Sequence, residues 1–306
     1  MRVSRAPRHT VQHPVQGFLA ALGAVAVLSA MDAVMKHLVL VIGIFAVSVW
    51  RSFVNVGMAS VLYFPRKSQW PTRRTLALHV ARGVLVTALA FLFFWGIGRV
   101  SLAQAIALTF IGPLIALLLA AAFLHERIGP RSIVGSIAAF AGVLLIMFGQ
   151  VQAKVGHEAI LGSGAILLSA ACYAVNIVMM RPQALAADPF EINFFQSVTV
   201  MGVWVLLLPL LGLPDAPAGQ WFWVVFASIL STCGTLLYGW GYARGPASYL
   251  AVTEYSGFLW ASLFGWLAFH ERVSATTVAG ATFIVGGCII DARGKRPDPP
   301  EIDVAA

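Results

Sequence analysis

Five ionisable side chains fall inside long apolar runs of the sequence, where charged residues are rare. They are Asp32, Arg51, His79, Arg82 and Glu254. Ionisable groups in a lipid bilayer are costly, so they usually face a cavity or one another. A guanidinium fork suits a carboxylate, and a carboxylate suits an ammonium group. Arg82 and Glu254 therefore indicate either two contacts to a small zwitterion or one structural ion pair, and the sequence leaves both interpretations open.

Known enzyme motifs are missing from the sequence. The dipeptide His-Glu suggests a zinc protease, but that motif needs a second histidine at its fifth position. The sequence has Gly129, Leu161 and Ser274 there. It contains neither a phosphate-binding P-loop nor a serine-hydrolase elbow, and its three cysteines lie far apart in apolar runs. We therefore expect no enzyme activity, no cofactor and no bound metal.

The composition is that of a polytopic membrane protein. Charged residues make up 10% of the 306 residues and apolar ones 59%, and the mean hydropathy is +0.86. A soluble domain is about one quarter charged, so this chain could not cover a surface that faces water. The net charge is +8, but the basic residues sit in short segments between apolar runs. This pattern suits orientation in a bilayer better than nucleic-acid binding.

Ten segments have the length and composition of membrane spans, which need about 20 mainly apolar residues. They are residues 16–36, 44–64, 75–98, 101–124, 130–149, 159–181, 190–212, 220–243, 247–269 and 274–292. The predicted fold class is therefore an all-α membrane protein with ten transmembrane helices. The stretch after Arg8 is long enough to span, so we expect an uncleaved first helix rather than a signal peptide. Gly112-Pro113 is expected to kink the fourth span.

The sequence repeats itself with a shift of 145 residues. His-Glu-Arg at 125–127 matches 270–272, and the glycines at 135 and 142 match those at 280 and 287. Each His-Glu-Arg follows a fourth span, where capping and anchoring of a helix hairpin is favoured over substrate contact. Because five spans are an odd number, the second half enters the membrane from the opposite side. The halves are thus expected to be inverted repeats around a central cavity.

Charge in the loops agrees with the inversion. The loop "PRKSQWPTRR" is strongly basic, whereas its counterpart in the repeat, "LGLPDAPAG", has no lysine or arginine. Basic loops face the cytoplasm, so both termini are expected on the cytoplasmic side of the cell inner membrane. The predicted organisation is a cytoplasmic segment at 1–15, five-helix units at 16–150 and 159–292, and a disordered cytoplasmic tail at 293–306.

Polar side chains three or four residues apart form stripes on the predicted helices. The span at 220–243 carries Ser228, Ser231, Thr232, Thr235, Tyr238 and Tyr242, and the span at 159–181 carries Ser169, Cys172, Tyr173 and Asn176. Such stripes also arise where helices hydrogen-bond to each other. The face that begins with His79 and Arg82 matches the Ser228 stripe in the repeat, which favours a shared central cavity. The predicted substrate-binding residues are His79, Arg82, Tyr173, Asn176, Ser231, Thr235, Tyr238, Glu254 and Tyr255.

A family resemblance rests on the residues that close the fourth span and line the fifth. Glu126 and Glu271, followed by glycines seven residues apart, resemble the EamA repeat of the drug/metabolite transporter superfamily. The resemblance covers both halves. It implies ten helices in an inverted repeat and transport of small metabolites. The sequence is most similar to the amino-acid exporters, the branch that includes the aromatic amino acid exporter YddG.

The expected function is export of neutral or aromatic amino acids by alternating access. A nucleotide-sugar or other metabolite carrier is the alternative, although Arg82 beside His79 offers little charge for a diphosphate. A second alternative, from another class, is an intramembrane lipid-modifying enzyme, whose catalytic constellation is not visible in the sequence. The expected partners are a small-molecule substrate and the lipid bilayer, without nucleic acid. The sequence leaves the oligomeric state open, and a monomer is sufficient.

Overall fold

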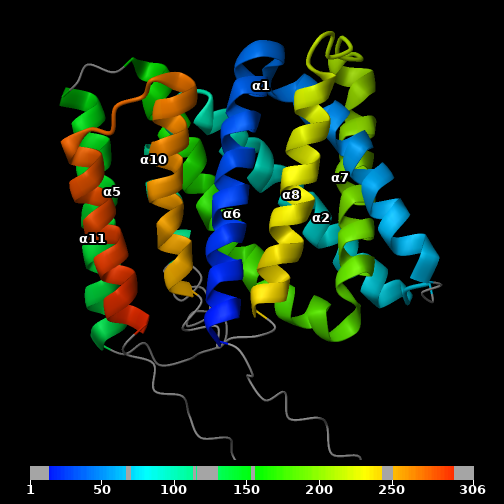
Figure 1. Ribbon diagram of the computed structural model, residues 1–306, viewed down its shortest axis with the longest axis horizontal. Helices are drawn as coiled ribbons and strands as arrows, with labels where there is room; N and C mark the ends of the chain where they lie inside the picture. The colour runs from blue at the N-terminus through cyan, green and yellow to red at the C-terminus, as the bar shows by residue number, and fades with distance from the viewer. Residues whose placement is uncertain are drawn as a thin grey trace, which may run out of the picture.

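The computed structural model describes residues 14–66, 70–112, 115, 130–152, 156–242 and 251–292. Within these ranges the secondary structure is helical, and the helices run roughly parallel to one direction (Figure 1). The start of α1, the first described helix, and the end of α11, the last described helix, lie at the same end of the molecule (Figure 1). The predicted terminal segment 1–15, except for its last two residues, and the tail at 293–306 lie outside the described residues.

The helices follow the predicted spans, with two differences. They are α1 Pro14–Tyr63, η1 Phe64–Arg66, α2 Arg73–Ile97, α3 Leu102–Thr109, α5 Pro130–Gln152, α6 His157–Ala186, α7 Pro189–Leu211, α8 Trp221–Tyr242, η2 Ala251–Tyr255, α10 Ser256–Phe269 and α11 Ala275–Ala292. The helices α1, α2, α6, α7 and α8 contain segments long and apolar enough to cross a membrane. Shorter apolar stretches lie in α5 and α11. The all-helical class predicted from the sequence is confirmed for the described residues, whereas the ten spans stay a prediction.

The first difference concerns the loop predicted between residues 36 and 44, which the structure reduces to a kink at Gly43. Helical hydrogen bonding continues on both sides, and Gly43 alone departs from helical geometry, with φ 78° and ψ 155°. Residues with a Cβ rarely adopt this conformation. An α-helix rises about 1.5 Å per residue, so an unbroken α1 would be more than twice as long as a bilayer core is thick. Gly43 therefore divides α1 into two limbs, 14–42 and 44–63.

The second difference is a break in two of the predicted spans. The helix α3 ends at Thr109, with Phe110 as its C-cap, and α10 begins after Tyr255 at the end of η2. Phe110 and Tyr255 are 145 residues apart and occupy equivalent positions in the repeat. Their rings pack edge to face, with centroids 5.5 Å apart. The break in α3 falls just before Gly112-Pro113, whose proline lies outside the described residues.

Helix packing follows the 145-residue register. The helix α1 packs on α8, and the corresponding α6 packs on α2. The other large contacts join α5 with α11, α1 with α7, α2 with α7, and α1 with α10; of these, α5 and α11 are equivalent helices in the repeat. Figure 1 shows α5 and α11 side by side at one edge of the molecule, and α1 beside α8 near its centre. The pairs α1–α8 and α2–α6 are therefore related by the 145-residue shift, and α5–α11 is related to itself.

Glycines bring the paired helices into backbone contact. A Cβ at Gly142 of α5 would lie 2.5 Å from the carbonyl oxygen of Gly280, and one at Gly287 of α11 would lie 2.3 Å from that of Gly135. These two contacts are equivalent in the repeat. Such small residues let membrane helices approach closely and pack by dispersion forces. The pair α5–α11 is thus held by two repeat-related glycine contacts.

The same relation holds where α2 meets α6 and where α8 meets α1. A Cβ at Gly96 would lie 2.8 Å from the Gly162 carbonyl oxygen, and one at Gly241 would lie 2.9 Å from the Gly17 carbonyl oxygen. Gly96 corresponds to Gly241, and Gly17 corresponds to Gly162, with the 145-residue shift. Glycine is therefore required at equivalent positions of both halves.

Candidate substrate-binding site

Arg82 lies near the middle of α2, with 9% of its surface exposed. Its Nε donates a hydrogen bond to the Asn176 Oδ1 at 2.8 Å, and its Nη1 donates to the Gln183 side-chain oxygen. Both acceptors belong to α6, which packs against α2. Neutral amides fix the guanidinium plane and leave its charge uncompensated. Within the described residues, no carboxylate forms an ion pair with Arg82.

His79 lies one turn before Arg82 on α2 and is fully buried. Its Nδ1 lies 2.6 Å from the Gln183 Nε2, and its Nε2 lies 3.2 Å from the Glu191 Oε1. Its ring stacks on Phe195 of α7, with centroids 5.2 Å apart. A single hydrogen-bonded chain therefore joins Glu191, His79, Gln183 and Arg82 across three helices.

A second polar group forms around Glu254. Tyr238 of α8 donates a hydrogen bond from its hydroxyl to the Glu254 carboxylate. Tyr173 of α6 interacts electrostatically with both Glu254 and Arg82. A Cβ added at Gly112 would lie 3.3 Å from the Tyr173 ring, so Tyr173 packs against the chain just after the break in α3. Tyr173 thus lies within electrostatic range of both the Arg82 and Glu254 groups.

The structure therefore keeps Arg82 and Glu254 in separate hydrogen-bonded groups. Arg82 binds the amide side chains of α6, and Glu254 accepts a hydrogen bond from Tyr238. The described residues show no direct ion pair between the two charges. The structure therefore gives no support among the described residues to one direct ion pair, and the contacts to a zwitterion stay a prediction.

Of the other predicted residues, two have contacts at the Arg82 chain or at the helix breaks, and two have no such described contact. Asn176 binds Arg82 directly, and Tyr255 packs on Phe110 at the helix breaks. Thr235 is exposed, and its hydroxyl donates to the Ser231 carbonyl of its own helix at 2.8 Å. No described contact joins Ser231 or Thr235 to the Arg82 chain, so their predicted role in binding stays a prediction.

Gln183 and Glu191 are the functional candidates that the sequence analysis missed. Gln183 is 1% exposed and Glu191 is 7% exposed. Glu191 falls within the predicted span 190–212, so its charge inside an apolar segment was a usable signal. Gln183 follows the span predicted at 159–181, because α6 continues to Ala186. Its role depends on contacts with α2, which local sequence does not reveal.

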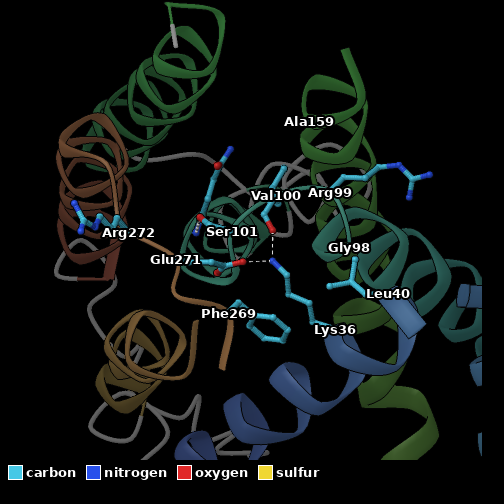
Figure 2. A pocket seen from close by; sticks show the side chains of 11 residues that line it. Lys36, Leu40, Gly98, Arg99, Val100, Ser101, Ala159, Phe269, Glu271 and Arg272 are labelled. Atoms are coloured by element: carbon cyan, nitrogen blue, oxygen red, sulfur yellow. Dashed lines mark hydrogen bonds and ion pairs between the residues drawn. The ribbon is translucent and has the colours of Figure 1, made fainter. Parts of the chain in front are cut away.

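An open cavity of about 530 Å³ lies at the end of the molecule that is opposite to the start of α1 and the end of α11. At its centre, the Lys36 amine donates to the Val100 carbonyl at 2.5 Å and to the Glu271 carboxylate (Figure 2). The Lys36 amine also lies 5.2 Å from the centre of the Phe269 ring. Figure 2 shows Arg99 pointing away from this ion pair. The pair therefore ties α1 to the turn between α10 and α11.

The second His-Glu-Arg motif, at residues 270–272, contributes Glu271 to this ion pair. The Glu271 Oε2 accepts a hydrogen bond at 2.8 Å from the backbone N–H of Leu102, in the first turn of α3. His270 is the C-cap of α10 and adopts a left-handed conformation with φ 54°. The predicted capping role of the motif is therefore observed, although Glu271 caps the helix of a different hairpin. The first copy, residues 125–127, lies outside the described residues.

The described part of the chain contains no group of three or more histidine, cysteine, aspartate or glutamate side chains that could hold a metal ion. The polar groups of the site are instead two hydrogen-bonded clusters between helices. Buried charges and aromatic rings between membrane helices are typical of a transporter site for a small solute.

Helical membrane transporters are the class of protein that this fold and site define. A family model for the EamA-like transporter family matches residues 15–148 and again residues 160–291. The chain belongs to the EamA-like transporter family. It is thus a multi-pass membrane transporter, and the family and named relatives are transporters rather than enzymes.

Curated relatives are similar over much of the chain. The pseudopaline exporter CntI of Pseudomonas aeruginosa (strain UCBPP-PA14) is 27% identical over 226 residues, which are 74% of this chain and 78% of that protein. The uncharacterized transporter YoaV of Bacillus subtilis (strain 168) is 24% identical and covers 55% of this chain and 59% of its own length.

A solved crystal structure shares the fold. It is 19% identical in sequence, with a TM-score of 0.62 over 92% of this chain and 99% of the other. These comparisons do not assign the chain to a branch of the family, so the resemblance to the YddG branch remains part of the proposal.

Proposed function

We propose that this chain exports neutral, bulky amino acids such as phenylalanine, tryptophan, leucine or methionine. The observation that carries the proposal is the state of Arg82. It is a buried guanidinium held by two amide oxygens, and no described carboxylate pairs with it. A buried charge without a partner is costly in a membrane. The carboxylate of a bound amino acid would supply that partner.

The other end of an amino acid requires an acceptor for its ammonium group. Glu254 provides a carboxylate near Tyr173, which also interacts with Arg82. The rings of Tyr173, Tyr238 and Tyr255 offer apolar faces and hydroxyl groups for a bulky side chain. Opposite charges with aromatic surface between them match a zwitterion that carries an apolar or aromatic group.

Alternating access would follow from two inverted five-helix halves, which we propose for residues 16–150 and 159–292. The double match to the family model supports this division, as do the glycine contacts and helix pairs related by the 145-residue shift. Breaks in α3 and α10 meet at Phe110 and Tyr255. Helices broken near an internal symmetry axis are typical of transporters whose halves rock around a central site.

The direction of transport and the location rest on two further arguments. A relative with 27% identity is named as an exporter, which supports outward transport here. The basic loop at 65–74 supports a cytoplasmic position for both termini in the cell inner membrane. A nucleotide-sugar carrier remains the alternative substrate class, but its diphosphate would need more than one central arginine.

Flux into proteoliposomes of the purified protein tests the substrate class. Radiolabelled phenylalanine, tryptophan, leucine and methionine should enter faster than in protein-free vesicles, and unlabelled amino acids should compete. Glucose and a uridine diphosphate sugar serve as comparison solutes. Transport of either comparison solute without transport of the four amino acids would overturn the proposal.

A further inference from the structure

His79 contacts protein groups through both of its ring nitrogens. Its Nδ1 lies 2.6 Å from the Gln183 Nε2, and its Nε2 lies 3.2 Å from the Glu191 Oε1. The ring also stacks on Phe195, with an angle of 7° between the two planes. The side chain is fully buried. The position and the orientation of the imidazole are therefore set by neighbours on α6 and α7.

The order of donors and acceptors in this chain determines where the proton of His79 lies. A guanidinium can only donate hydrogen bonds, so the Gln183 atom that faces the Arg82 Nη1 must be the amide oxygen. The amide nitrogen of Gln183 therefore faces His79 and donates to its Nδ1. An Nδ1 that accepts a hydrogen bond carries no proton, so the ring has its proton on Nε2, which donates to Glu191. The chain thus selects one neutral tautomer of His79.

A second proton on the His79 ring conflicts with this arrangement. A proton on Nδ1 would point at the Gln183 NH2 group, which is itself a donor. The conflict is relieved when the Gln183 amide turns over and presents its oxygen to Nδ1. The amide nitrogen then faces the Arg82 guanidinium, where two donors meet. In this geometry the Gln183 oxygen can therefore accept from Arg82 or from a protonated His79, but not from both.

Charged neighbours act on such a proton in opposite directions. Among the described residues, Glu191 is the ionisable side chain that contacts the His79 ring, and its carboxylate would attract an added positive charge. Arg82, one turn away on α2, would repel it. Contacts of further ionisable side chains on α1 and α6, which also pack on α2, join Tyr63 to Phe194, Arg51 to Phe94, Lys36 to Glu271, His37 to Gln220, and Glu158 to Arg99.

We propose that His79 is a positioning residue whose proton state decides whether Gln183 holds Arg82. With the neutral ring, the Gln183 oxygen accepts from Arg82 and keeps the guanidinium in place for a solute carboxylate. Uptake of one proton from water at Nδ1 turns the amide over, so Arg82 keeps its bond to Asn176 but loses the one to Gln183. Release of that proton to water restores the original bond. The effect on solute binding rests on the proposed function, whereas the tautomer and its link to Gln183 do not.

Nitrogen NMR of the ring tests the tautomer without any solute. The protein is labelled with isotope-enriched histidine and measured in lipid vesicles. The chain has 7 histidines, and the signal that is missing in His79→Asn identifies His79. In neutral buffer this signal should be that of a neutral ring with its proton on Nε2. A proton on Nδ1 in neutral buffer would overturn the proposal.

The variant Gln183→Glu tests the link between the two side chains. It has nearly the same shape, but it replaces the NH2 donor that faces His79 by an oxygen acceptor. The His79 signal should change to that of a ring with a proton on Nδ1. A His79 tautomer that stays the same in Gln183→Glu would overturn the control by Gln183.

Exchange of labelled phenylalanine in proteoliposomes, with equal pH on both sides, tests the effect on Arg82. The carboxylate of phenylalanine stays ionised in mildly acidic buffer, so a change in affinity belongs to the protein. The half-saturating concentration of wild type should rise on the order of 10-fold from neutral to mildly acidic buffer, because Arg82 loses a charge-assisted hydrogen bond. In His79→Asn this rise should disappear, since the asparagine oxygen can accept from Gln183 and does not titrate.

The matched control is His37→Asn, which replaces a half-buried histidine that contacts Gln220. It should keep the wild-type rise. A wild-type half-saturating concentration that does not change with pH, or an unchanged rise in His79→Asn, would overturn the control of Arg82 by His79. If wild type does not exchange phenylalanine at all, the proposed substrate is wrong, and the NMR measurement still decides the tautomer and its link to Gln183.

Discussion

Gln183 is the residue that orients the side chains of the Arg82 site. Its amide accepts from the Arg82 Nη1 and contacts the His79 Nδ1 at 2.6 Å. One buried side chain therefore orients both the guanidinium proposed to hold the substrate carboxylate and the histidine behind it. A buried polar group that loses its only partner costs about 1–3 kcal/mol. Replacing Gln183 by an apolar residue of similar size should thus affect two groups at once.

We predict that Gln183→Leu lowers the stability of the detergent-purified protein by about 2–4 kcal/mol, because two buried polar groups lose a partner. The melting temperature should fall clearly. The matched variant Gln220→Leu removes a half-buried glutamine whose contact with His37 is long, at 3.3 Å. It should change the melting temperature little. Equal shifts in the two variants would show that the hydrogen-bonded chain contributes nothing measurable.

The sequence identifies the charged side chains of the site but not the residues that hydrogen-bond to them. Arg82, His79 and Glu254 stand out because ionisable groups in apolar runs are rare. Their separation into two hydrogen-bonded groups depends on Gln183, Glu191 and other residues about 100 positions away along the chain. Contacts of this kind arise from helix packing, which a single sequence does not specify.

Close helix pairs are the main feature at the scale of the elements. The contact between α5 and α11 depends on backbone approach at Gly142 and Gly287, where an added Cβ would overlap a carbonyl oxygen. Gly286 is adjacent to Gly287 on the same helix, but a Cβ there would meet nothing within 4 Å. The two neighbouring glycines therefore allow a controlled comparison.

Gly287→Ala should destabilise the protein by about 1–3 kcal/mol, because the new methyl group must push α11 away from α5. Gly286→Ala should be neutral or should stabilise the helix by up to about 1 kcal/mol, since alanine favours helix more than glycine does. Melting temperatures of the two purified variants make the comparison. A drop in Gly286→Ala as large as that in Gly287→Ala would contradict the observed packing.

The helices could be predicted from the sequence to within a few residues, since apolar runs of sufficient length define them. Two features could not. The helix α1 continues through residues 37–42, where a loop was predicted, because Gly43 alone makes the turn between its limbs. The residues on both sides of Gly43 have helical propensity, so the sequence gave no sign of this turn. The breaks at Phe110 and Tyr255 lie inside apolar runs, where hydropathy is the same for a continuous and an interrupted helix.

The molecule as a whole is organised by the 145-residue register. The helix pairs α1–α8 and α2–α6, the glycine contacts and the helix interruptions at Phe110 and Tyr255 each map onto an equivalent in the other half. Repeats of five spans would have opposite orientations in the membrane. In the proposed inverted arrangement, the Arg82 and Glu254 groups would lie between the halves, where rocking would expose them to each side in turn.

Reporter fusions test that orientation. Fusions after Gln69 and after Ala306 should report the cytoplasm, because their flanking segments are basic. A fusion after Lys154 should report the periplasm, since three predicted spans separate it from Gln69. Reports from the same side for Gln69 and Lys154 would contradict the inverted arrangement of the halves.

The most direct test of the central claim is exchange of labelled phenylalanine by wild type and Arg82→Gln in proteoliposomes. Loss of a charge-assisted hydrogen bond costs about 1.5–3 kcal/mol, so the half-saturating concentration should rise about 10- to 100-fold in Arg82→Gln. The control Arg99→Gln removes an arginine that pairs with Glu158 at the surface, at 2.7 Å, and should exchange as wild type does. Saturable exchange that Arg82→Gln weakens and Arg99→Gln preserves is the predicted result. Wild-type protein that exchanges no phenylalanine, or folded Arg82→Gln that exchanges it as well as wild type, would contradict the account.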